Sequence, residues 1–165
     1  MTAEQQLVDA NLRAWKFTTD KFQTLFRDLS DSQLEVEVAP GRNRLLYLLG
    51  HIAAVHDRML PLLGIGPRLH PELDAAFLEN PDRKVTSPLS GSQLKTISAE
   101  IDQALLSAFS KWTAADWMAK HTSVSDEDFA KEPHRNRLSV LLSRNTHLAF
   151  HWGQAILTTP RGNEM

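Results

Sequence analysis

Four long stretches of this chain carry apolar side chains at helical spacing, and this pattern restricts the chain to a helical fold. In the third stretch, for example, Leu94, Ile97, Ile101 and Leu105 recur every three or four residues and so share one face of a helix. No segment alternates apolar and polar residues as a half-buried strand does. The sequence therefore predicts an all-α four-helix bundle, with helices at residues 3–29, 44–63, 92–112 and 136–158.

The link between the second and third helices is unusually rich in proline. Five of the eight prolines fall between Pro61 and Pro88. Antiparallel neighbours usually need only a short link, whereas a long one can run back along a helix of about 30 Å. We therefore expect a crossover between parallel helices two and three, in up-down-down-up order, with a helical turn at 72–77. A lid or a disordered excursion is the alternative.

The ends of the helices carry recognisable signals. Pro40 and Gly41 precede the second helix and Gly64 follows it. Ser90 and Gln93 have the spacing of a capping box, which predicts the start of the third helix. A further helical turn is expected at 114–118.

Length and composition exclude several classes of protein. A chain of 165 residues favours one domain, here 1–165, and is long enough to bury a core. The net charge is −2 and the 18 basic residues are scattered, so we expect no nucleic-acid partner. The apolar stretches are too short and too often interrupted by charges to cross a membrane.

The chain contains no cysteine, which excludes disulfides, thiolate nucleophiles and thiolate metal ligands. The first residues, 1–6, lack both the basic and the apolar region of a secretory signal. Both features predict a cytoplasmic protein. Any metal ion would have to be held by nitrogen and oxygen atoms.

The pattern with the clearest chemistry is His147-x-x-x-His151 in the fourth helix. Residues four apart lie on one face of a helix, so both imidazoles can reach one metal ion. The chain has seven histidines, however, and such a pair can also arise by chance and serve only as a hydrogen-bonded bundle edge. We expect three of the others, His70, His121 and His134, to be exposed to solvent.

A third ligand would have to come from another element. His51 and His56 flank the apolar stripe of the second helix on opposite edges, so only one of them can face the fourth helix. The periodicity of the helix does not choose between them.

Two motifs resemble the DinB-like superfamily: Leu49-Gly50-His51-Ile-Ala-Ala in the second helix, and HxxxHxGQ, which ends at Gln154, in the fourth. The resemblance covers essentially the whole chain. It implies a four-helix bundle whose second and third helices are parallel. It also implies a divalent metal ion, typically zinc or nickel, bound by His51, His147 and His151. His56 has no counterpart and is interpreted as a core-margin or hydrogen-bonded residue.

The resemblance further implies a function. Several members are similar to thiol S-transferases that use bacillithiol, mycothiol or glutathione, and one type is a thiol-dependent isomerase. We therefore expect a metal-dependent thiol S-transferase that takes a low-molecular-weight thiol and a small electrophilic substrate. The first alternative is a non-catalytic metal-binding or stress-associated bundle, in which the metal joins helices two and four. The second is a bundle without metal.

Five polar residues are candidates for a pocket or for orienting a ligand histidine, because the helical wheel places them near the histidines or within the apolar arc of the first helix. They are Gln154, Tyr47, Arg58, Arg144 and Asn11. Phe150 and Leu157 lie away from the main apolar stripe of the fourth helix, which predicts a second covered face. A homodimer contact or the long loops would cover it.

Overall fold

The computed structural model describes residues 2–87 and 89–158. Within them, four long helices form the body of the protein: α1 (Ala3–Arg27), α3 (Leu45–Leu62), α5 (Gly91–Phe109) and α8 (Arg137–Ile156). The short elements between them are α2 (Asp31–Leu34), η1 (Pro71–Leu73), α4 (Asp74–Phe77), α6 (Ala114–Met118) and α7 (Asp126–Lys131). The described residues contain no β-strand, so the predicted all-α class is confirmed.

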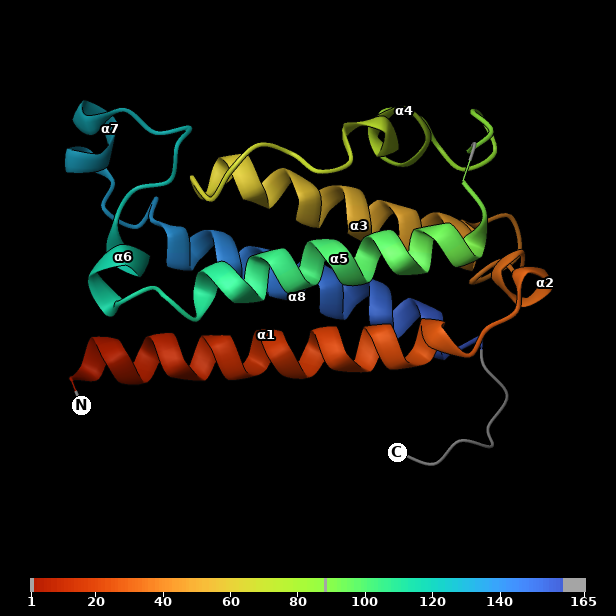
Figure 1. The fold of residues 1–165 in the computed structure, drawn as a ribbon, viewed down its shortest axis with the longest axis horizontal. Coiled ribbons are helices and arrows are strands. Elements are labelled where there is room, and N and C mark those ends of the chain that lie inside the picture. Colours follow the sequence, from red (N-terminus) through yellow and green to blue (C-terminus); the bar gives the residue numbers. More distant parts are fainter. Residues whose placement is uncertain (1, 88, 159–165) are drawn as a thin grey trace.

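The long helices run up, down, down and up (Figure 1). In this view α1 and α8 run from left to right, while α3 and α5 both run from right to left. α1 packs chiefly against α8, and α3 packs chiefly against α5. The parallel pair requires the chain to return along the length of α3, and the segment with η1 and α4 does so above the bundle.

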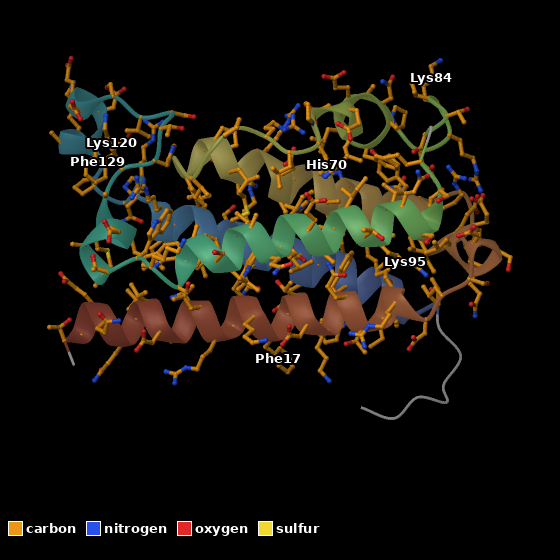
Figure 2. The ribbon with its side chains drawn as sticks, in the orientation of Figure 1. Phe17, His70, Lys84, Lys95, Lys120 and Phe129 are labelled. Carbon is orange, nitrogen blue, oxygen red and sulfur yellow. The ribbon has the colours of Figure 1, made fainter. Side chains whose placement is uncertain are left out.

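Buried polar contacts anchor this crossover segment to the bundle. The carboxylate of Asp57, fully buried on α3, accepts hydrogen bonds from the backbone N–H groups of Leu69 (2.8 Å) and His70 (3.1 Å). Arg68 binds the same carboxylate through Nε at 2.8 Å and also pairs with Asp74. His70, labelled in Figure 2, lies close to α5. Its Nε2 atom is 3.4 Å from Oε2 of Glu100 on that helix. The long link is therefore an ordered crossover and not a disordered excursion.

The capping signals place the helix ends where local chemistry requires them. Ser90 and Gln93 form the predicted capping box at the start of α5, and the predicted turn at 114–118 is α6. Gly64 ends α3 with a φ of +74°, a left-handed conformation that favours glycine. Two short helices were not predicted. α2 begins at a second capping box, formed by Ser30 and Gln33, and α7 begins at Ser125, whose side chain caps the helix.

The core lies between the four long helices. Trp15 of α1, Ile52 of α3, Ile101 of α5 and Leu148 of α8 are all completely buried in it. Because α3 contacts α4 and η1 as well as α5 and α8, most of its circumference is buried. None of the helices in the described part of the chain combines the length and the apolar character needed to cross a membrane.

Candidate metal centre

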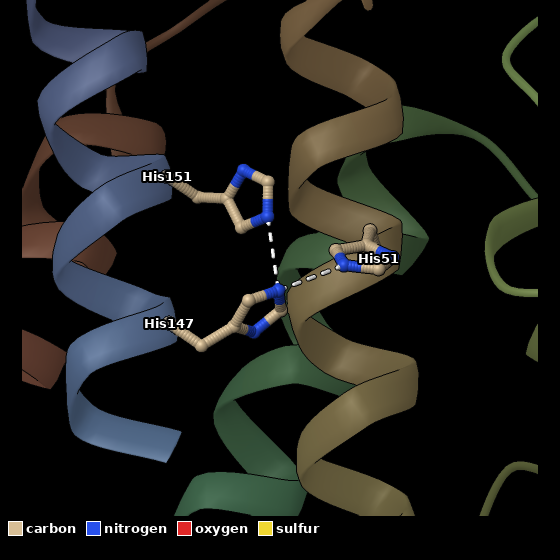
Figure 3. Close-up of side chains that lie close together, drawn as sticks. All are labelled: His51, His147 and His151. Atoms are coloured by element: carbon tan, nitrogen blue, oxygen red, sulfur yellow. Dashed lines mark hydrogen bonds between the residues drawn. The ribbon is translucent and has the colours of Figure 1, made fainter. Parts of the chain in front are cut away.

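Three histidines from two helices meet at the margin of the core. His147 and His151 lie one turn apart on α8, and His51 faces them from α3 (Figure 3). The Nε2 atom of His147 lies 3.2 Å from Nε2 of His51 and 3.1 Å from Nε2 of His151. All three side chains are half-buried, and their nitrogens form a group that could hold a metal ion.

Two of the three rings are oriented by hydrogen bonds on the opposite nitrogen. Nδ1 of His51 donates to the backbone carbonyl of Phe77 at 2.8 Å. Nδ1 of His151 donates to Oε1 of Gln154, also at 2.8 Å. Histidines that bind metals usually donate their second N–H in this way, which holds the ring and its tautomer.

Gly50 makes the first of these hydrogen bonds possible. A Cβ atom at this position would overlap the ring of Phe77, so a larger residue would push α4 away from α3. The absence of a side chain lets α4 approach closely and brings the Phe77 carbonyl to His51. The small residue beside His51 thus has a direct structural role at the site.

The nitrogen lone pairs make the site suitable for a cation. A carbonyl oxygen only accepts hydrogen bonds, so Nδ1 of His51 carries the proton and its Nε2 carries a lone pair. The same holds for His151 beside Gln154. Nε2 of His147 carries one proton at most, so it can donate a full hydrogen bond to only one of the lone pairs on His51 and His151. Two nitrogens on one tetrahedral zinc lie about 3.4 Å apart, close to the observed separations.

The same environment keeps the rings unprotonated. Burial, followed by the neighbouring charge of His151, lowers the pKa of His147 to about 4. Burial also lowers the pKa of His51 and of His151, although the hydrogen bonds to Phe77 and Gln154 oppose it. Neutral imidazole is the form that binds metals, so all three rings are ready to bind one at neutral pH.

These observations can be set beside known proteins. A model of the DinB superfamily matches residues 14–155. The chain belongs to the DinB superfamily. A solved structure described as a conserved protein of locus from Enterococcus faecalis has a similar fold, with a TM-score of 0.61. The two sequences are 17% identical, and the match covers 96% of this chain and 95% of the other. A search of curated proteins finds no match.

The region matched by the DinB superfamily includes His51, His147 and His151. The matched region also includes His56, the other candidate on α3, but His56 lies away from the three histidines. It is buried, and its Nδ1 lies 2.7 Å from Oδ1 of Asp102 on α5, while its ring packs on Trp15 at a centroid distance of 4.7 Å. The interpretation of His56 as a hydrogen-bonded residue agrees with this position. Its acidic partner, Asp102, was not predicted.

The five polar candidates separate into two groups. Gln154 binds His151, the Tyr47 ring stacks parallel to His51 at 5.9 Å, and the charge of Arg144 acts on His147. The remaining two form other contacts: Arg58 pairs with Asp74, and Asn11 donates to the Leu7 carbonyl of its own helix. Neither of these forms a hydrogen bond or an ion pair with the three histidines.

The other histidines only partly follow expectation. His134 is exposed as predicted, but His70 and His121 are half-buried. Packing against α5 and the acidic side chains of Glu72 and Glu100 shields His70, and the Nδ1 atom of His121 is buried. Both lie in loops, where periodicity carries no information about burial.

An aromatic ring and a pocket lie beside His151 and its partner Gln154. The Phe150 ring stands edge-on to His151 with the ring centroids 5.1 Å apart. Gln154, the partner of His151, lines an open pocket of about 510 Å³ together with Val38, Ala39, Arg42, Asn43 and Leu157. Sequence reasoning found neither the pocket nor the role of the Phe77 carbonyl, because both depend on loops folding back onto the helices.

Proposed function

We propose that the protein binds a divalent metal ion, zinc or nickel, through the Nε2 atoms of His51, His147 and His151. The observation that carries this proposal is the convergence of three ring nitrogens. Nε2 of His147 lies 3.1–3.2 Å from Nε2 of each of the other two histidines, and two of the rings are held by hydrogen bonds on Nδ1. Three protein ligands leave a coordination position open, as catalytic sites do and closed structural sites do not.

We further propose that the bound metal serves a thiol S-transferase that acts on small electrophiles. When bound, such a metal lowers the pKa of a thiol and supplies a nucleophile near neutral pH. The thiol loses its proton, its sulfur forms a bond to the electrophilic carbon, and the leaving group departs. The absence of cysteine is compatible with this reaction, because the attacking sulfur belongs to a low-molecular-weight cosubstrate.

The residues around the histidines would serve this reaction by orientation and by shielding. The Phe77 carbonyl and Gln154 hold two of the ligand rings. The rings of Tyr47 and Phe150, which pack against His51 and His151, would shield a bound metal from part of the surrounding water. The pocket beside Gln154 gives room for a small electrophile.

A non-catalytic role is the second candidate, and one observation favours it. The ligands come from α3 and α8, which make fewer contacts with each other than α1 makes with α8. A metal ion would join these two helices and stabilise the bundle without turnover.

The decisive measurement is the metal content of protein purified without chelator or affinity tag. We expect a stoichiometric divalent ion in the wild type and its loss in His151→Ala. The metal-loaded protein should consume glutathione with a model electrophile, and chelation should abolish this activity until zinc or nickel is restored.

Each alternative result has a definite meaning. Wild-type protein without a divalent ion would contradict both the catalytic and the joining role. A metal that raises the melting temperature but supports no turnover with any thiol would favour the joining role alone.

We also propose a homodimer and a cytoplasmic location. Leu142 and Phe150 of α8 are exposed, as is Leu157 directly after it. Phe17 of α1 is also exposed and points away from the bundle (Figure 2). A second copy would cover such side chains. Low-molecular-weight thiols are kept reduced in the cytoplasm, which suits the reaction. Light scattering of wild type and Phe150→Ser measures the oligomeric state.

A further inference from the structure

Arg144 differs from the other half-buried arginines of the described residues because it has no partner. Its side chain forms no hydrogen bond or ion pair, and its Nε atom is buried without an acceptor. The others bind carboxylates, or in one case a backbone carbonyl and a tryptophan ring: Arg44, Arg68, Arg135 and Arg137. A partly buried guanidinium without a partner is costly to maintain.

The unpaired charge of Arg144 lies close to the three histidines. Arg144 lies three residues before His147 on α8, a spacing that makes the two side chains neighbours on one face. Its charge is close enough to help lower the pKa of His147. Burial lowers the pKa of Arg144 itself, and no acidic group opposes that effect.

The charge around the site is therefore positive and unbalanced. Three neutral imidazoles leave the charge of a divalent ion uncompensated, and Arg144 adds another positive charge. The group of possible metal ligands contains no carboxylate. Asp102 is engaged by His56 and Gln23, so it is not free to pair with Arg144. An anionic ligand would supply the missing charge.

We infer that Arg144 binds a carboxylate of the molecule that enters the site beside the metal. A guanidinium donates paired hydrogen bonds to a carboxylate and holds it in a defined direction. This inference rests on the proposed metal centre and deepens it, since it selects acidic thiols or acidic electrophiles over neutral ones. Arg144 is thus a specificity-determining residue one helical turn from His147.

The test compares small probes on cobalt-loaded protein, whose absorption spectrum reports ligands at the metal. The probes are mercaptoacetate, the neutral thiol 2-mercaptoethanol, and acetate, and calorimetry gives their dissociation constants. We expect wild type to bind mercaptoacetate about tenfold more tightly than Arg144→Gln does, the effect of one charge-assisted contact. Binding of 2-mercaptoethanol should be unchanged.

Arg58→Gln is the matched control, because Arg58 is exposed on α3 and pairs with Asp74. It should leave all three affinities unchanged. Arg144→Lys, which keeps the charge, should retain part of the preference for mercaptoacetate. The cobalt stoichiometry shows whether each variant is folded and loaded with metal. If Arg144→Gln does not fold or bind cobalt, the comparison is made with Arg144→Lys instead.

The possible outcomes separate this inference from the proposed function. Arg144-dependent binding of acetate, with equal binding of both thiols, would assign the carboxylate to the electrophile. Arg144-dependent acetate binding without any thiol binding would contradict thiol transfer and leave the inference standing. Equal carboxylate binding by wild type and Arg144→Gln would overturn the inference.

Discussion

His51 and His56 lie on the same helix, α3, yet their surroundings differ in every respect that matters for chemistry. His51 is half-buried, bound on Nδ1 by a backbone carbonyl, and faces two other histidines. His56 is completely buried, bound on Nδ1 by the carboxylate of Asp102, and faces Trp15.

The partner and the position of each histidine decide its role. A neutral carbonyl orients His51 and leaves its Nε2 lone pair directed at His147. The carboxylate of Asp102 instead joins α3 to α5 inside the core, where Gln23 of α1 completes the network through a 2.8 Å hydrogen bond. We therefore propose that the first region binds a metal ion and that the second stabilises the fold, and the following predictions test this division.

The largest effect on stability is expected for His56→Ala. Removing this ring leaves the buried carboxylate of Asp102 without its main partner, which costs about 3–5 kcal/mol of unfolding free energy. Urea unfolding measures it. Replacing both residues by leucine should recover most of the loss, because hydrophobic residues can substitute for a buried pair. A loss below about 1 kcal/mol would show that the pair does not hold α3 to α5.

The largest effect on metal binding is expected for His51→Gln. Losing an orienting partner alone weakens metal binding about 10–100-fold, so losing a ligand should exceed about 100-fold. His56→Gln should leave the affinity nearly unchanged. Competition with a chromophoric chelator gives both constants. Equal losses in the two variants would mean that the division between the two regions is wrong.

A smaller effect is expected for Gln154→Ala. His151 keeps its ring nitrogen but loses the acceptor that orients it, so the metal affinity should fall by about tenfold. The same chelator competition measures it. Gln33→Ala, on α2, provides a control outside the site. An unchanged affinity in Gln154→Ala would show that the helix itself orients His151 sufficiently.

The smallest effect is expected for the pH dependence of the unfolding free energy of the metal-free protein. The pKa of His147 is about 4 in the folded protein, below the ordinary value of 6.5. Between these values the unfolded chain binds a proton that the folded chain does not, so stability falls as the pH falls from 6.5 towards 4. Because the ring is half-exposed, we expect roughly 1 kcal/mol. Urea unfolding at pH 7 and 5 measures the loss, and His147→Gln should reduce it.

Much of the fold could be predicted because its signals are local. Helical periodicity identified the four long helices, and the capping box of Ser90 and Gln93 marked the start of α5. The length and proline content of the link indicated the crossover. α2 was missed although Ser30 and Gln33 also form a capping box, because four residues are too few to show a periodic stripe.

That His147 and His151 share a face follows from their spacing alone, because a helix of fixed pitch places residues four apart side by side. Family resemblance favoured His51 as their partner, but the residues of α3 alone did not choose between His51 and His56. Only the tertiary structure decided that choice, since most of the circumference of α3 is buried and its stripe has no single inner edge. Packing of α8 on one side and α5 on the other places His51 beside His147 and His56 beside Asp102.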